Sequence, residues 1–149
     1  INSSAVKRPE LITEIAETFG SQCVVVAIDT KCEDSEWKVF VNGGRKATGL
    51  NTVEWAQQVE EKGAGEILLT SMNNDGTKAG FAIDITDQVS SAVNIPVIAS
   101  GGAGSKEHFK NVFEQTKATG GLAASIFHYG EIPIPELKNY LKEEKIAIR

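Results

Sequence analysis

The stretch Pro96–Phe109, PVIASGGAGSKEHF, changes character twice along its length. Val97–Ala99 is a short apolar run typical of a buried strand, and the polar sequence from Lys106 onward is compatible with a helix. Between them, Ser100–Gly104 carries almost no side chain. Bare backbone lets main-chain N–H groups approach a ligand closely, and N–H groups at the start of a helix favour anions. The stretch therefore predicts a strand–turn–helix unit with an anion-binding turn.

Three further apolar runs resemble this strand. Most of the runs lack polar alternation, which is typical of strands buried on both faces in a parallel sheet. Serine, threonine or aspartate ends each of them. The predicted strands lie near residues 23–29, 66–71, 96–100 and 121–125.

Amphipathic segments alternate with these runs. In the first, one apolar stripe is expected to carry Leu11, Ile12, Ile15, Ala16 and Phe19. In the second, Asn51 and Glu54 have the spacing of a capping box. Alternation around Asn42–Gly44 instead predicts a hairpin inserted near residues 36–47. Strands alternating with helices predict an α/β fold, and we expect residues 1–149 to form a single domain. The predicted helices cover residues 9–19, 51–62, 84–93, 106–117 and 135–144.

Composition excludes several classes of protein. The 149 residues carry a formal charge of −5, which argues against a nucleic-acid or anionic-membrane surface. We find no apolar run long enough for a membrane span and no signal peptide, so we expect a cytoplasmic protein. Cys23 and Cys32 are expected to be free thiols, because neither belongs to a C-x-x-C pair.

The polar strand ends indicate where a site would lie. Asp29, Thr70, Ser100 and Ser125 each fall at or just beyond the carboxyl end of a predicted strand. Parallel strands bring these ends to one rim, which is where barrels and open α/β sheets bind ligands. Any one of these residues could simply cap a helix, but their coincidence favours a site.

Two turns on this rim have sequences that suit an anion. NNDGT at Asn73–Thr77 and SGGAGS at Ser100–Ser105 both allow main-chain N–H groups to converge. Neither is a P-loop, and no dinucleotide fingerprint is present, so no cofactor is expected. Asp29 and Asp75 are the carboxylates best placed for proton transfer if partial burial raises their pKa, although Asp75 could merely shape its turn.

The two histidines give no metal-site signal. His108 and His128 are far apart in sequence and lack clear ligand partners, so no metal is expected. His108 is predicted on a helix surface, and Trp37 and Trp55 are predicted to serve in packing.

Several motifs together resemble one family. VVVAID, GAGEILLTS, DGTKAGF, IASGGAG and LAASIFH occur in the order and spacing of the cyclase subunit (HisF) of imidazole glycerol phosphate synthase, a histidine-biosynthesis enzyme. The resemblance covers essentially the whole chain but only the second half of the family's (βα)8 barrel. It implies a (βα)4 half of a TIM barrel, with INSSAV resembling the end of the preceding strand. GAGEILLTS and ASGGAG favour the cyclase over the related isomerase of the same pathway, which shares DGT.

The resemblance also implies roles for individual residues. Asp29 matches a strand-end general acid or base of ring closure, and Asp75 matches a carboxylate of the loop that holds one phosphate of a bisphosphate substrate. Asn2 and Ser3 match part of the other phosphate site, and Glu66 matches a charged residue near the ammonia entrance beside the glutaminase subunit (HisH). Thr70 and Ser100 would line the interior. The implied phosphate-binding residues are Gly76, Thr77, Gly101, Gly102, Ala103, Gly104, Ala124 and Ser125.

Some features depart from the family pattern. The family's other acid–base residues, an aspartate and a lysine, belong to its first strand and following loop and have no counterpart in these 149 residues. Ala82 stands where an aspartate is usual, which removes a helix-start hydrogen bond. TGG at Thr119–Gly121 is looser than the usual sequence and predicts a weakly held last strand.

A half-barrel would leave one apolar face and two strand edges uncovered. We expect a homo-oligomer, a dimer or larger, to cover them; the alternative is a rearranged flavodoxin-like sheet with helices on both faces. Three functions remain open. The chain is a cyclase portion that acts once a barrel is completed, a non-catalytic module that binds phosphate, or a relative of the isomerase.

Overall fold

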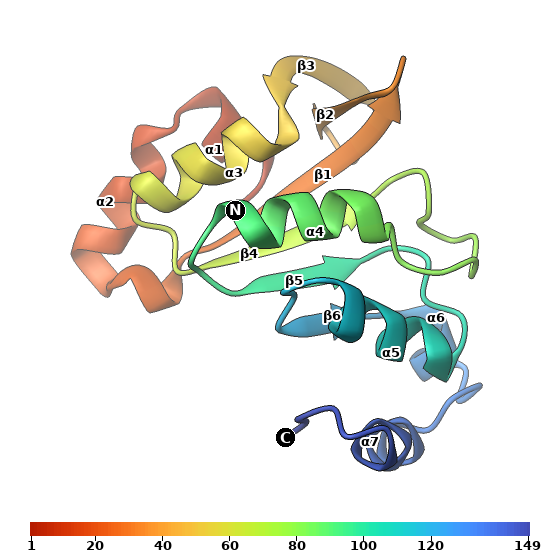
Figure 1. The fold of residues 1–149 in the computed structure, drawn as a ribbon. Helices are drawn as coiled ribbons and strands as arrows, with labels where there is room; N and C mark the ends of the chain where they lie inside the picture. The colour runs from red at the N-terminus through yellow and green to blue at the C-terminus, as the bar shows by residue number, and fades with distance from the viewer.

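The computed structural model describes residues 1–149 and contains one six-stranded sheet in the order β3-β2-β1-β4-β5-β6 (Figure 1). Four strands are parallel: β1 (Val25–Glu33), β4 (Glu66–Ser71), β5 (Val97–Ser100) and β6 (Gly120–Leu122). Two antiparallel strands, β2 (Glu36–Val41) and β3 (Lys46–Asn51), extend the sheet beyond β1. The expected α/β sheet with four parallel strands is therefore confirmed.

The helices follow the strands in the expected alternation. α4 (Ile83–Ala92), α5 (Lys106–Gln115) and α7 (Ile134–Glu143) lie within about two residues of their predicted ends. α3 packs on α4, α4 on α5 and α5 on α7, so these helices form one layer beside the sheet. Lys106–Glu136 and Lys110–Glu144 ion pairs fasten α7 to α5. The remaining helices are α1 (Ser3–Lys7), α2 (Glu10–Phe19), a 3-10 turn η1 (Ser21–Cys23), α3 (Thr52–Glu61) and α6 (Ser125–His128).

Burial alternates along the strands and identifies the face that the helices cover. Val26 and Ile28 of β1, and Ile67 and Leu69 of β4, are buried in one core cluster with α2, α3 and α4. A second cluster joins Ala99 of β5 to α5, α6 and α7. The alternate residues, such as Ala27, Leu68 and Ile98, are only half-buried and belong to neither cluster.

Covering only one face distinguishes this sheet from the flavodoxin-like alternative, which would place helices on both faces. A parallel sheet with helices on one side is the arrangement of half a TIM barrel, whose inner face is closed by the other strands. The (βα)4 half-barrel is therefore the fold observed.

The predicted boundaries of several strands were wrong. β1 continues four residues past Asp29 to Glu33 because it pairs with β2, and Asp34 and Ser35, both with positive φ, form an additional hairpin turn. The predicted turn at Asn42–Gly44 is present between β2 and β3. Cys23 lies exposed in η1 instead of inside a strand.

Both ends of the parallel sheet also differ from expectation. Ile1 donates to Val25 O at 2.7 Å and accepts from Ala27 N–H at 2.8 Å, so it lies beside β1 like a strand, but Ser3–Lys7 is helical. β6 ends at Leu122, and Ser125 begins α6. Phe19, expected on the apolar stripe of α2, is 65% exposed, whereas Trp55 is buried as predicted.

Helix caps follow local sequence. The Asn51 side chain accepts from the N–H groups of Val53 and Glu54, as its cap position predicts. Ala82 is the N-cap of α4 and supplies no side-chain hydrogen bond. The α4 N-terminus therefore keeps backbone donors that a polar cap would satisfy.

We expect Ala82→Asp to raise the free energy of unfolding by about 1 kcal/mol and the Tm by about 2–4 °C, because it restores the missing cap. Ala82→Ser separates the hydrogen bond from the added charge and should give most of the gain. Ala92→Ser, at the other end of the same helix, is the matched control and should give none. Thermal unfolding followed by circular dichroism measures all three, and an unchanged Tm in both Ala82 variants would contradict the cap assignment.

Candidate functional site

The strand register sets a row of side chains across the open face of the sheet. Asp29 pairs with Thr70, Thr70 with Ser100, and Ser100 with Leu122. Residues in register point to the same face, so this row crosses all four parallel strands at their carboxyl ends. Ala27, Leu68, Ile98 and Gly120 form the next row inward. The open face thus changes from apolar to polar toward the rim.

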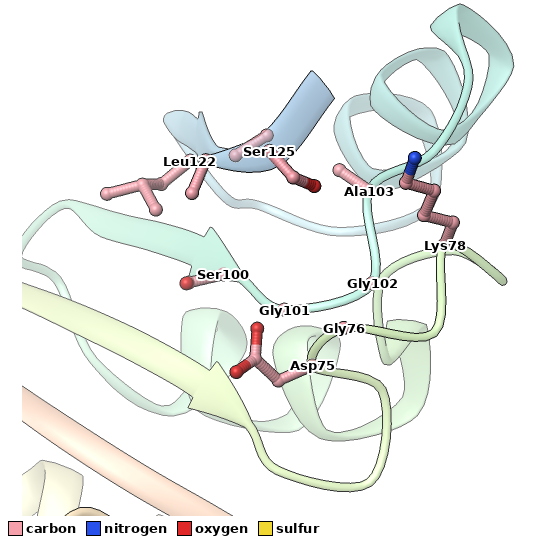
Figure 2. Close-up of a pocket in the computed structure, with 11 residues that line it drawn as sticks. Asp75, Gly76, Lys78, Ser100, Gly101, Gly102, Ala103, Leu122 and Ser125 are labelled. Atoms are coloured by element: carbon pink, nitrogen blue, oxygen red, sulfur yellow. The ribbon is translucent and has the colours of Figure 1, made fainter. Parts of the chain in front are cut away.

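A pocket of about 240 Å³ lies at this rim, beyond the ends of β4, β5 and β6 (Figure 2). That is smaller than the cavities that hold drug-sized ligands, and it suits a compact group. Figure 2 shows the Asp75 carboxylate pointing toward Gly101, with Ser125 on the opposite wall. The pocket is lined by Asp75, Gly76, Lys78, Ser100, Gly101, Gly102, Ala103, Leu122, Ala123, Ala124 and Ser125.

Main-chain N–H groups around this pocket have no acceptor in the protein. Gly101, Gly102 and Ala103 are buried, and none of their N–H groups donates a hydrogen bond. The N–H groups of Gly76 and Ala124, which are exposed, and of the half-buried Ala123 likewise donate no hydrogen bond. A buried N–H without a partner costs free energy, and such groups are rare in native proteins. An anion in the pocket would satisfy several of them at once.

Hydrogen bonds lock the two loops of the site together. Gly80 N–H donates to Gly102 O at 2.7 Å, and Asn74 Nδ2 donates to Gly80 O at 2.9 Å. Asn74 Oδ1 in turn accepts from the buried Ser71 hydroxyl at 2.9 Å. A Cβ at Gly102 would lie 2.1 Å from Gly80 O, so only glycine permits this approach. The role of Asn74 was not predicted from the sequence, because it depends on how the β4–α4 loop folds back to bring Gly80 beside Asn74.

One charged residue at the rim, Lys78, is paired with an opposite charge. Lys78 donates to both carboxylate oxygens of Glu131, each at 2.7 Å, which ties the β4–α4 loop to the segment after α6. Asp75 is exposed, so the burial expected for a proton-transfer carboxylate does not occur there. Asp29 is half-buried in the rim row, beside Thr70.

Other predicted site residues lie apart from the pocket. The Thr77 hydroxyl donates to Asn74 O at 2.6 Å and accepts from Ala79 N–H, so it shapes its own turn. Gly104 N–H donates to the His108 ring and is therefore not free for an anion. Ser3 Oγ accepts from Asn42 N–H, and neither Asn2 nor Ser3 reaches the pocket. Glu66 lies at the other end of the open face, in register with Val25.

His108 departs from its predicted place on the helix surface. It is half-buried at the first turn of α5, and its ring accepts hydrogen bonds from the glycine loop. The sequence signal for this position was the spacing Ser105-x-x-His108, which is that of a capping box with His in place of the usual Glu or Gln. No three His, Cys, Asp or Glu side chains converge on a metal-binding geometry, and no helix has the length and apolar character to cross a bilayer.

The fold and the site together define four consecutive βα units of a TIM barrel with a rim pocket rich in main-chain donors. The sequence profile of the histidine biosynthesis protein family matches residues 1–133, and the chain belongs to this family.

Relatives within the family give a more specific correspondence. The chain is 63% identical over 150 residues to the imidazole glycerol phosphate synthase subunit HisF of a Hydrogenobaculum species. It is 58% identical over 151 residues to the subunit HisF of Clostridium botulinum strain Okra. Each match covers all of this chain and 60% of the relative, so the chain corresponds to the C-terminal half of HisF.

We expect Gly102→Ala to lower the free energy of unfolding by more than about 2 kcal/mol, because it combines a positive φ with a clash against Gly80 O. Gly43→Ala is the matched control: its φ is also positive, at 68°, but nothing lies within 4 Å of the added Cβ. Chemical denaturation of both variants measures the difference. Equal losses would mean that backbone strain, and not loop contact, explains the glycine.

Proposed function

We propose that this chain is the cyclase portion of an imidazole glycerol phosphate synthase. The reaction is the ammonia-dependent ring closure of a phosphoribulosyl-formimino aminoimidazole carboxamide ribotide to imidazole glycerol phosphate. The observation that carries the proposal is the pocket of unpaired N–H groups beside the Asp29 row, in a chain whose relatives bear this enzyme's name. As a step of histidine biosynthesis, the reaction would take place in the cytoplasm.

The pocket would anchor one phosphate of the substrate. N–H groups of Gly101, Gly102 and Ala103, with those of Ala124 and Ser125, would donate to the phosphate oxygens, as first-turn helix donors do. Fixed donors lose little freedom on binding, so the binding energy can orient the rest of the substrate. Asp75, beside this pocket, would face the part of the substrate next to the phosphate.

Asp29 is proposed as the general acid or base of ring closure. It is in register with Thr70, and the two strands β4 and β5 separate it from Leu122 at the edge of the pocket, so an anchored substrate would extend along the row toward it. A carboxylate on a rigid strand keeps its position during proton transfer. Thr70 and Ser100 would line the path between the two groups.

The opposite end of the open face is proposed as the entrance for ammonia. Glu66 begins β4 there, on the same face as Asp29 and at the amino end of the parallel strands. A glutaminase subunit, HisH, would dock at that end and deliver ammonia along the interior. Asn2 and Ser3 remain proposed for the second phosphate. The Ser3 hydroxyl would then accept a hydrogen bond from Asn42 N–H and donate one to the phosphate at the same time.

The open face supports a proposal of assembly with a second copy. Val25, Ala27, Leu68 and Ile98 are half-buried apolar residues that no helix of this chain covers. A partner sheet would bury them and pair the free edge of β6. A pair of half-barrels would also bring two copies of Asp29 to one rim.

Ring closure is tested with the purified chain, alone and mixed with the N-terminal portion of a HisF relative, by following ammonia-dependent consumption of the bisphosphate substrate. Asp29→Asn should lower turnover by at least about 100-fold, because it removes the proton-transfer group. Asp34→Asn is the matched control: it makes the same change in the exposed β1–β2 turn, where Asn tolerates the positive φ of 53°. It should leave turnover unchanged.

The outcomes separate the candidate functions. Turnover by the chain alone that depends on Asp29 would mean that self-assembly completes a site. Turnover only in the mixture would identify a portion that needs its complement. Phosphate binding without turnover in either sample would replace the proposal with the non-catalytic phosphate-binding module, which the same pocket supports.

Assembly is tested by sedimentation velocity over a range of concentrations. We expect the parent chain to sediment as a dimer or larger species and Leu68→Glu to sediment as a folded monomer, because a charge on the open face opposes burial. Gln57→Glu, at an exposed position of α3 on the helix-covered side, is the matched control and should assemble like the parent. A monomeric parent chain would contradict the proposal.

A further inference from the structure

The ring of His108 accepts hydrogen bonds from the backbone of the glycine loop. Its Nδ1 accepts from Gly104 N–H at 3.0 Å and from Ser105 N–H at 3.2 Å. An atom that accepts two N–H groups carries no proton of its own, so the neutral ring is protonated at Nε2. These two bonds fix the backbone just where the loop of unpaired donors joins α5.

The same residue completes the start of α5. His108 occupies the third helical position of a capping box, in which the Ser105 side chain accepts from the His108 backbone N–H. Glu or Gln is usual at this position, and both keep their acceptor at every pH above about 5. An imidazole differs because it loses its acceptor on protonation within the range of pH 5 to 8.

The ring also lies beside the second loop of the site, with which it shares a small cavity. A Cβ at Gly80 would lie 3.5 Å from His108 Cδ2, and Gly80 is the residue that donates to Gly102 O at 2.7 Å. His108 is thus bonded to one side of the contact that shapes the pocket and lies beside the other, although it does not line the pocket itself. Its effect on a ligand must therefore pass through the loops.

We propose that His108 is a positioning residue that holds the glycine loop in its anion-binding conformation only while the imidazole is neutral. The inference rests on the proposed binding of phosphate at the rim pocket. Protonation would place an N–H against the two N–H groups of Gly104 and Ser105, so these bonds would be lost. Phosphate affinity is then expected to fall below neutral pH for a reason separate from the ionisation of phosphate.

The charged residues around the ring do not change the direction of this effect, which is a weaker phosphate affinity at lower pH. On α5 itself, the neighbouring charged residues are Lys106 and Glu107; the pKa of Glu107 is held below its ordinary value, chiefly by its own backbone N–H and then by the Ser105 side chain. From the β4–α4 loop, Lys78 is paired with Glu131, and Asp75 faces Gly101. At the start of α4, Asp84 is engaged by Trp37 and Gln88. The residues that share a small cavity with the ring are uncharged: Ala79, Gly80, Phe81, Ile83 and Asn111.

The test compares inorganic phosphate binding at pH 8 and pH 5.5 in the parent chain and in His108→Gln, His108→Ala and His128→Gln. His108→Gln keeps an acceptor that does not titrate, so its affinity reports the ionisation of phosphate alone. We expect the parent to match His108→Gln at pH 8 and to bind about tenfold more weakly than it at pH 5.5, the effect of losing one or two hydrogen bonds. His108→Ala should be about tenfold weaker at both pH values.

His128→Gln is the matched control, because the chain contains only two histidines. It should keep the pH dependence of the parent. Loss of that dependence in His128→Gln would overturn the inference, as would a His108→Ala chain that binds like the parent or a His108→Gln chain that binds as weakly as His108→Ala.

Amide hydrogen exchange supplies a readout that does not depend on phosphate. At pH 8 the Gly104 and Ser105 amides should be equally protected in the parent and His108→Gln, and at pH 5.5 they should exchange faster in the parent. Equal exchange at pH 5.5 overturns the inference. A parent chain that binds no phosphate at either pH overturns the proposed function and the ligand assigned here. It does so even if the exchange result shows that the bonds of His108 to Gly104 and Ser105 depend on pH.

Discussion

The parallel main-chain ladder of β1, β4, β5 and β6 is the constraint on which the rest of the molecule depends. It fixes which residues stand side by side, and so it turns four separate strand ends into one row and one rim. A shift of one residue in any strand would move its polar end to the helix-covered face. The buried alternation of Val26, Ile28, Ile67 and Leu69 opposes such a shift, because it would expose these side chains.

The core that maintains this register lies on one side of the sheet. Its two clusters share the same face, one under α2, α3 and α4 and the other under α5, α6 and α7. Since no helix crosses to the other face, the inner rows remain half-buried and apolar. The packing that stabilises the half-barrel therefore also creates the surface that a complementary sheet would bury.

The rim pocket depends on a second level of order, in which two loops fix each other. Gly80 N–H donates to Gly102 O across the two loops, Asn74 holds the Gly80 carbonyl from within the same loop, and His108 braces this contact from α5. The unpaired N–H groups nearby are costly in the free chain. Loops held this rigidly retain such groups in place and aim them into one pocket, which is what an anion site needs.

Local spacing and backbone preference alone predict the order of strands and helices, the central β4 strand, the Asn51 cap, the turn at Asn42–Gly44 and the glycine-rich rim. The folded structure set other features: β1 continues to Glu33, Gly104 donates to His108, Thr77 serves its own turn, and Asn74 holds Gly80 where it meets Gly102 of the other loop. It also decided that helices cover a single face. These features depend on which segments meet across the sheet and between loops, and apolar periodicity cannot tell one partner from another.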